Sequence, residues 1–247
     1  MDGKVGYTMP LDSFRQLMRG IQGRLNPAYS GGQNSQQIAF LRQMQKDMKQ
    51  ESALGIPLEQ LNVVVFDIET TGFYPELGDE IISIGAVRIR QGKICEEEVF
   101  YSLVRYEQPL PVKIEQLTGI SSAELKVARE LSEVLILFLN FVQNDTLVAH
   151  HALHEKSFLQ NASWKLFRTP FKHRIVDTSF LYRIVEPEIS LLRLEDLCEH
   201  NGISVLDRHH ALGDAVLAAK LWCAYIRKVK EIGCMTLSDV YEYLARM

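Results

Sequence analysis

The feature that most constrains this chain is an apolar run, residues 63–72, that contains two carboxylates. It reads Val-Val-Val-Phe-Asp-Ile-Glu-Thr-Thr-Gly, the composition of a β-strand that ends in a turn. Alternate side chains of a strand share a face, so Asp67 and Glu69 point the same way. Because the strand is otherwise apolar on both faces, it is expected to be central in its sheet. Two such carboxylates repel each other and lose hydration, which favours a bound divalent cation; a strand tip that has reached water is the alternative.

The composition restricts the class of protein. With 247 residues, 47% of them hydrophobic, the chain can form one large domain with or without an appendage. No apolar run is long enough to span a membrane, and the first twenty residues lack the apolar core of a secretory signal. The four cysteines form no C-x-x-C pair, which indicates reduced thiols in a cytoplasmic protein. The net charge of −4 neither supports nor excludes nucleic-acid binding, because metal ions can supply positive charge.

The chain changes character near residue 58. Apolar residues at helical spacing predict amphipathic helices over residues 11–25 and 36–50, joined by a flexible loop over residues 26–35. Residues 1–60 carry 7 Lys and Arg against 5 Asp and Glu, whereas the remainder carries 20 against 26. We therefore expect a helical N-terminal extension, residues 1–58, and a main domain, residues 59–247. The extension either packs on the main domain or serves as an arm that docks or touches nucleic acid.

The order of the elements after residue 60 predicts an α/β fold. Strands are expected over residues 62–69, 80–90 and 94–104, with Gln91-Gly92-Lys93 as a hairpin turn. A helical region over residues 121–142 follows, then a strand over 146–150, a helix over 152–161 and a strand over 174–178. The last helices are expected at residues 179–184, 193–201, 211–232 and 237–247. Hairpin strands followed by alternating helices and strands indicate a mixed β-sheet flanked by helices.

A second group of polar residues follows the strand at 146–150. It contains His150, His151, His154 and Glu155, and a helix that starts near residue 152 would place Glu155 in its first turn. Zinc is disfavoured, because Phe158 stands where an H-E-x-x-H site needs its second histidine. Glu155 alone is also what an ordinary helix N-terminus carries, since an acid there complements the helix dipole.

A third group precedes and opens the last long helix. Asp214 stands near the start of an alanine-rich segment, whose small residues permit close packing against the sheet. An acid that complements the helix dipole is the alternative for Asp214. On a continuous helix His210 would share the face of Asp214, so a functional His209 must lie in a loop ahead of the helix.

Together these groups resemble the DEDDh class of 3′–5′ exonucleases, of the proofreading epsilon-subunit type of bacterial DNA polymerase III. The resemblance covers residues 62–226. The first family motif, D-x-E-T-T-G, is matched by residues 67–72, and the following I-I-x-I-G-A-V strand by residues 81–87. The segment 117–121 is similar to the family's turn whose Ile contacts the terminal base. The third motif, H-x-A-x-x-D-A, is matched by His209, Ala211, Asp214 and Ala215, a register that selects His209 over His210.

One position departs from the family pattern. The second motif, H-N-A-x-F-D-x-x-F-L, appears as His150-His151-Ala152-Leu153-His154-Glu155-Lys156-Ser157-Phe158-Leu159, so Glu155 replaces the family Asp. The longer side chain must reach the site by a different rotamer, and Mg²⁺ tolerates misplaced ligands poorly. We expect Glu155 to support the second metal with reduced or Mn²⁺-favouring activity. An inactive nuclease-like module is the alternative.

The resemblance implies an RNase H-like fold and two divalent cations, Mg²⁺ or Mn²⁺, held by Asp67, Glu69, Glu155 and Asp214. It implies His209 as general base and release of nucleoside 5′-monophosphates from a 3′ end. Thr70, Thr71, Gly72, Ile120 and Phe158 would bind or support the last nucleotide.

The substrate and the partners stay open at this point. The substrate is DNA in proofreading or repair, or RNA as in other members of the class; a non-catalytic docking module is the third hypothesis. A proofreading role would require a polymerase or other replication or repair protein in trans, with no membrane involved. Asp177 is interpreted as a helix cap. The basic stretch from Lys156 to Arg174 is either a solvated face or a contact for backbone phosphates.

Overall fold

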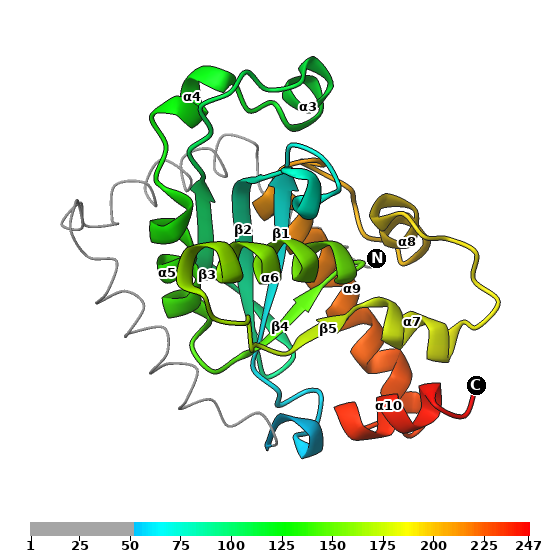
Figure 1. Cartoon of the computed structure of the whole chain (residues 1–247). Helices are drawn as coiled ribbons and strands as arrows, with labels where there is room; N and C mark the ends of the chain where they lie inside the picture. Colours follow the sequence, from blue (N-terminus) through cyan, green and yellow to red (C-terminus); the bar gives the residue numbers. More distant parts are fainter. Residues whose placement is uncertain (1–51) are drawn as a thin grey trace. The chain divides into compact units, whose positions relative to one another are not determined.

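A five-stranded mixed sheet forms the centre of the part of the chain that the computed structural model describes, residues 52–247 (Figure 1). The strands are β1 (Val63–Thr70), β2 (Ile81–Arg90), β3 (Lys93–Leu103), β4 (Thr146–Ala149) and β5 (Ile175–Asp177), in the order β3-β2-β1-β4-β5. β1 pairs antiparallel with β2, and β2 with β3, whereas β1–β4 and β4–β5 are parallel. The predicted α/β fold with a mixed, RNase H-like sheet is confirmed.

Strand β1 is central and has apolar side chains on both faces, as its sequence predicts. Val63 and Val65 belong to one buried cluster, and Val64 and Phe66 belong to the other. Asp67 and Glu69 continue the side of Val63 and Val65 by the two-residue period of a strand. The two carboxylates therefore face the layer that contains the long helix α9 (Ala211–Glu231).

Helices cover both faces of the sheet (Figure 1). The cluster on one face includes residues of α5 (Leu131–Val142) and α6 (Leu153–Phe167). The cluster on the other face includes residues of α7 (Ser179–Val185), α8 (Leu194–His200), α9 and α10 (Leu237–Leu244). The short helices α3 (Val112–Thr118) and α4 (Ser122–Lys126) lie beyond one end of the sheet, and the 3₁₀ turns η1 (Ser52–Gly55) and η2 (Pro75–Leu77) flank β1 in sequence. None of the described helices combines the length and the apolar composition needed to cross a bilayer.

Two details of the helices differ from the sequence prediction. The expected helix over residues 121–142 is interrupted, because segment 127–130 pairs with the chain that leaves β3: Arg105 N donates to Arg129 O at 2.7 Å. Helix α3 was not predicted. It starts directly after Pro111 and ends at Gly119, whose φ of 69° is the left-handed conformation that glycine adopts at a helix end.

The two N-terminal helices predicted over residues 11–25 and 36–50 lie outside the described residues. The described end of the expected extension, residues 52–58, is close to the C-terminal helix: Pro57 bridges Thr236, and Leu58 N donates to Met235 O at 2.7 Å. Leu58 is 3% exposed and belongs to the cluster under α9. The boundary near residue 58 stays a prediction.

Candidate active site

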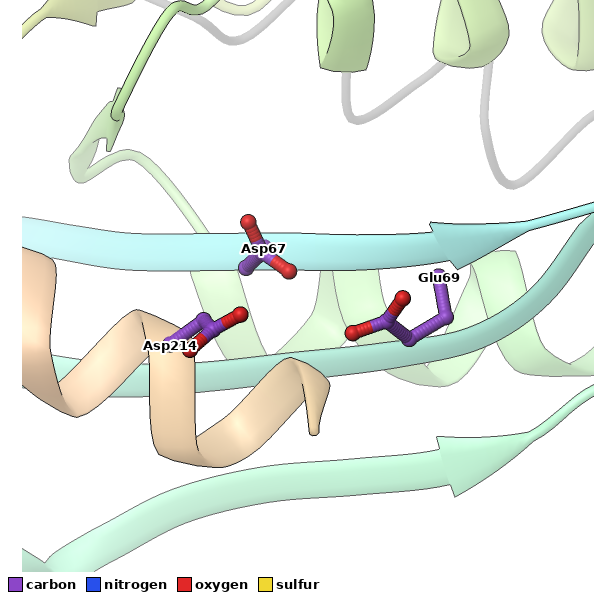
Figure 2. Close-up of side chains that lie close together, drawn as sticks. All are labelled: Asp67, Glu69 and Asp214. Carbon is purple, nitrogen blue, oxygen red and sulfur yellow. The ribbon is translucent and has the colours of Figure 1, made fainter. Parts of the chain in front are cut away.

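Three carboxylates meet where β1 lies against the first turn of α9. One oxygen from each of Asp67, Glu69 and Asp214 lies within 4.8 Å of the other two. Figure 2 shows the side chains of Asp67 and Glu69 leaving the same strand and pointing toward Asp214 on the helix. The pairing of Asp67 and Glu69 was predicted from strand alternation, whereas Asp214 was expected near the sheet from the small residues of its helix and beside these acids from the family resemblance.

Gly85 in β2 permits this approach of helix to sheet. It is the sheet partner of Asp67, and a Cβ atom built on it would lie 2.1 Å from Leu212 N and 2.3 Å from Ala211 C. Only a residue without a side chain leaves room for the backbone of α9 at this point. Gly85 thus allows the first turn of α9 to rest on β2 and brings Asp214 next to Asp67.

Burial raises the pKa of each carboxyl in this cluster, and repulsion between carboxylates adds to the effect at Asp67 and Glu69. The pKa of Asp67 is held well above its usual range by burial, and then by the charges of Glu155, Glu69 and Asp214. Burial raises the pKa of Glu69 to about 8, with a further contribution from Asp214, and burial also raises that of Asp214. The ionised cluster therefore needs positive charge nearby.

One arginine supplies part of that positive charge. Arg208 Nη1 lies 2.5 Å from Asp214 Oδ2, and its Nη2 donates to Glu195 Oε2 in α8 at 2.9 Å. The backbone N–H of His209 donates to the same Asp214 Oδ2 at 3.1 Å. Neither Arg208 nor Glu195 was predicted from the sequence, because local patterns do not reveal that α8 packs beside the start of α9.

Glu155 lies in the first turn of α6, as predicted, and its side chain is buried next to the cluster. It is 4% exposed, and its pKa is raised to about 8 chiefly by burial, with smaller contributions from Asp177 and Glu69. Its charge in turn raises the pKa of Asp67, so the two carboxyls are close. Glu155 is nevertheless outside the group of three oxygens within 4.8 Å of one another. The structure therefore brings three of the four expected acids together and places the fourth beside them.

His209 lies in the loop ahead of α9, as the family register requires. Its φ of 60° is a left-handed conformation that is uncommon for a residue other than glycine. His210 instead caps the helix, because its Nδ1 accepts from Gly213 N at 3.3 Å while its ring stacks on Tyr101 at 4.6 Å between centroids. Both histidines precede the helix, so the spacing rule that favoured His210 does not apply. Tyr101, in β3, carried no sequence signal; burial and then Glu69 raise its pKa.

Thr70, Thr71 and Gly72 shape the loop that follows β1. Thr70 Oγ1 donates to Gly72 O at 2.6 Å, and Thr71 Oγ1 accepts from Glu80 N at 3.0 Å. A Cβ atom on Gly72 would lie 2.3 Å from a carboxylate oxygen of Asp79, so a larger residue would displace the Asp79 side chain from its place in this turn. The hydroxyl groups expected to bind a nucleotide are thus engaged in holding the loop beside Glu69.

Two predicted nucleotide contacts, Ile120 and Phe158, lie below the surface. Ile120 is 5% exposed and belongs to a small apolar cluster with Ile82, Leu110 and Leu125. Phe158 is 2% exposed and packs against His154 at 4.8 Å between ring centroids. An exposed aromatic residue, Phe73, lies nearby: it is 76% exposed, and its ring centroid is 5.9 Å from that of His154. Phe73 was not singled out from the sequence.

The residues of the cluster fit a hard divalent cation such as Mg²⁺ or Mn²⁺. The donor set consists of carboxylate oxygens, which these ions prefer. Two buried oxygens, Glu155 Oε2 and Asp214 Oδ1, have no hydrogen-bond partner within residues 52–247, although such acceptors are normally satisfied. Carboxylate oxygens that are buried without a hydrogen-bond donor in this way are suited to hold a cation.

Comparison with known proteins identifies the family. The sequence model of the RNase T exonuclease family matches residues 64–222, so the chain belongs to this exonuclease family. It is 36% identical over 181 residues to a DNA polymerase III PolC-type protein of Caldanaerobacter subterraneus subsp. tengcongensis, which covers 73% of this chain and 13% of that protein. It is also 36% identical over 193 residues to a DNA polymerase III subunit epsilon-like protein of Rhodobacter capsulatus, covering 77% of this chain and 27% of the relative. The chain thus spans a small part of the length of these relatives.

Solved structures show the same fold. Exonuclease I of E. coli, in complex with an oligonucleotide, aligns with a TM-score of 0.60 at 17% identity, over 75% of this chain and 44% of the other. The nuclease domain of 3′hExo, a DEDDh family member bound to rAMP, aligns with a TM-score of 0.59 at 23% identity, over 71% of this chain and 94% of that domain. The resemblance to DEDDh exonucleases inferred from the motifs is confirmed.

Proposed function

We propose that this chain is a metal-dependent 3′–5′ exonuclease that releases nucleoside 5′-monophosphates from the 3′ end of DNA. The observation that carries the proposal is the cluster of Asp67, Glu69 and Asp214 in a chain of the exonuclease family. DNA is favoured over RNA because the relatives are named as DNA polymerase III proteins. The likeness to the 3′hExo domain bound to rAMP keeps RNA as the second substrate.

The acids of the site have distinct roles in this proposal. Asp67, Glu69 and Asp214 would hold one divalent cation, and Glu155 with Asp67 a second. Bound cations would supply Lewis-acid stabilisation of the charge that develops on the phosphate. Arg208 balances the charge of Asp214 from the side of α8.

His209 would act as the general base. It takes a proton from the attacking water, the resulting hydroxide forms a new bond to phosphorus, and the bond from phosphorus to the 3′-oxygen breaks in line with it. The leaving 3′-oxygen then takes a proton from solvent, which leaves a free 3′-hydroxyl on the shortened strand. His209 is suited to this role because its backbone bonds to Asp214 and its loop immediately precedes α9.

The longer acid in the second motif should affect the choice of metal. Glu155 is buried beside the cluster and has one unpartnered oxygen, so it is placed to contribute a ligand directly or through water. Mn²⁺ tolerates less regular coordination than Mg²⁺, which requires near-octahedral ligands at about 2.0–2.1 Å. We infer activity that is higher with Mn²⁺ than with Mg²⁺.

The biological setting follows from the relatives. We propose a proofreading or repair role in the cytoplasm beside a DNA polymerase or other replication protein, because the matched proteins are DNA polymerase III components. Residues 59–247 would form the exonuclease domain, and the first 58 residues would form a helical N-terminal extension.

The deciding experiment uses matched 5′-labelled single-stranded DNA and RNA oligonucleotides in Mg²⁺, Mn²⁺ or EDTA. Asp67→Ala is the inactive control, and Glu96→Ala is a matched control on the exposed part of β3. A ladder that shortens from the 3′ end, requires metal and disappears with Asp67→Ala is the expected result, with DNA degraded faster than RNA. Faster RNA degradation would reassign the substrate. Absence of cleavage on both strands in both metals would leave the docking module as the function.

A further inference from the structure

Helix α6 carries an unpaired basic surface that the proposed chemistry does not use. Lys156, Lys165 and Arg168 are exposed, and none of them forms an ion pair within residues 52–247. From Lys156 to Val176 the sequence contains no Asp or Glu, although the chain as a whole has a net charge of −4. The positive charge of this helix is therefore not neutralised locally.

The same surface exposes a tryptophan. Trp164 is 53% exposed, whereas the other tryptophan of the chain, Trp222, is 1% exposed. Trp164 lies next to Lys165 and one helical turn before Arg168, whose N–H donates to Trp164 O at 3.1 Å. An exposed indole between basic side chains combines the two features by which proteins bind single-stranded nucleic acid, aromatic stacking and phosphate pairing.

The direction of α6 connects this surface with the active site. Glu155 occupies the first turn, beside the carboxylate cluster, and Arg168 caps the other end. In Figure 1 the helix runs as one continuous element across a face of the sheet. Thirteen residues at about 1.5 Å each separate Glu155 from Arg168 by roughly 20 Å, the span of about six nucleotides at about 3.4 Å per nucleotide.

We propose that the exposed face of α6, defined by Lys156, Trp164, Lys165 and Arg168, binds the single strand that leads into the active site. Trp164 is nine residues from Glu155, roughly 14 Å along the helix, so a base about four nucleotides from the 3′ end stacks on Trp164, and the three basic side chains pair with backbone phosphates. This inference rests on the proposed exonuclease function, since it places the 3′ end at the carboxylates. A polynucleotide fits the surface because it offers both a row of negative charges and planar bases.

The first test uses the fluorescence of Trp164. An Asp67→Ala protein, which does not degrade its ligand, is titrated with single-stranded DNA of about three and about twelve nucleotides in Mg²⁺ buffer. The longer strand should quench the emission of the exposed tryptophan, and the shorter strand should not reach it. Trp164→Phe in the same background should abolish the quenching, because the remaining Trp222 is buried. Equal quenching by both lengths, or none by either, would overturn the proposal.

The second test removes the positive charge. Lys156→Gln, Lys165→Gln and Arg168→Gln are combined, and a charge-matched control combines changes at the exposed residues Arg183 on α7 and Lys220 and Arg227 on α9. The first triple variant should bind the longer strand about tenfold more weakly near physiological salt, with the slope of log affinity against log salt reduced by about two. The control should bind as the parent protein does. Equal losses in both variants would mean that only overall charge matters, and no loss in the first would refute the surface.

The two proposals fail in distinguishable ways. If the exonuclease function is wrong, the parent protein degrades neither length, whatever α6 does. If only the surface is wrong, the parent degrades both lengths, and the α6 triple variant degrades the longer strand at the parent rate under subsaturating conditions. The expected result is a triple variant that is slowed about tenfold on the longer strand and much less on the shorter one, which is long enough to reach Lys156 but not Arg168.

Discussion

Replacing Gly85 by alanine should separate the carboxylates while leaving each of them in the chain. The added Cβ would lie 2.1 Å from Leu212 N, 2.3 Å from Ala211 C and 2.5 Å from Leu212 Cα, all of them backbone atoms. Ordinary contacts begin at 3.4 Å, so the first turn of α9 must retreat by about 1.3 Å, the difference between 3.4 and 2.1 Å. Asp214 moves with this turn, whereas Asp67 stays in β1.

The expected losses of cleavage rate, Mn²⁺ affinity and stability follow from this displacement of the helix. A misplacement of about 1 Å at a catalytic group costs roughly 100-fold in rate, and overpacking a core costs about 1–3 kcal/mol of stability. We therefore expect Gly85→Ala to fold, to lose about 100-fold in exonuclease rate, and to bind Mn²⁺ at least about tenfold more weakly.

The assay combines three measurements on one protein preparation: Mn²⁺ affinity by calorimetry, single-turnover cleavage of a labelled strand, and thermal unfolding. Gly55→Ala is the matched control, because a Cβ at Gly55 meets nothing within 4 Å. The reasoning would be refuted by a folded Gly85→Ala protein that binds Mn²⁺ and cleaves within twofold of the parent.

Three further predictions concern metal, buried charge and helix capping. First, the pKa values of Glu69 and Glu155 are raised to about 8, so between pH 6.5 and 8 the folded metal-free protein holds protons that the unfolded chain has already released. Its stability should fall as pH rises through this window, and added Mn²⁺ should raise the melting temperature more at pH 8 than at pH 6.5. The buried imidazole of His150 does not contribute to this pH dependence, because its pKa is lowered to about 4, below the range used. A melting temperature in EDTA that rises between pH 6.5 and 8 would contradict this reasoning. Second, Arg88 is a buried charge whose side chain is 6% exposed. It pairs with Asp145, its Nε lies 3.0 Å from Glu98 Oε2, and it donates to Phe141 O. Arg88→Met leaves these partners without their cation, so urea denaturation should show a loss of about 3 kcal/mol of stability. Adding Asp145→Leu should recover part of the loss, and a cost equal to that of the single variant would show that the pairing is not the cause. Third, Thr236 closes a capping box with Asp239 at the start of α10, so Thr236→Ala should cost about 1 kcal/mol while Thr236→Ser costs little. Equal unfolding midpoints for all three proteins would remove the cap as a source of stability.

Much of the fold follows from patterns that extend over a few residues. The alternation in residues 63–69 predicts that Asp67 and Glu69 share a face with Val63 and Val65, and the two buried clusters confirm that assignment. The turn at residues 91–92 joins β2 to β3 as expected, with φ of 50° at Gln91 and 68° at Gly92. The interrupted helix at residues 127–130 was missed because its backbone pairs with Arg105, a partner more than twenty residues earlier in the chain.

The candidate site also combines features that local sequence patterns predict with features that only the packing of distant elements sets. By itself, the sequence determined which acids exist, which face of β1 two of them occupy, and that Glu155 opens a helix, because a strand repeats every two residues and a helix every 3.6. The tertiary structure decided how near those acids come. Asp214 reaches Asp67 because Gly85 admits the backbone of α9, and Arg208 offsets the charge of Asp214 because α8 presents Glu195 beside it. These contacts join residues that are far apart in sequence, and no local periodicity encodes the distance at which two packed elements come to rest.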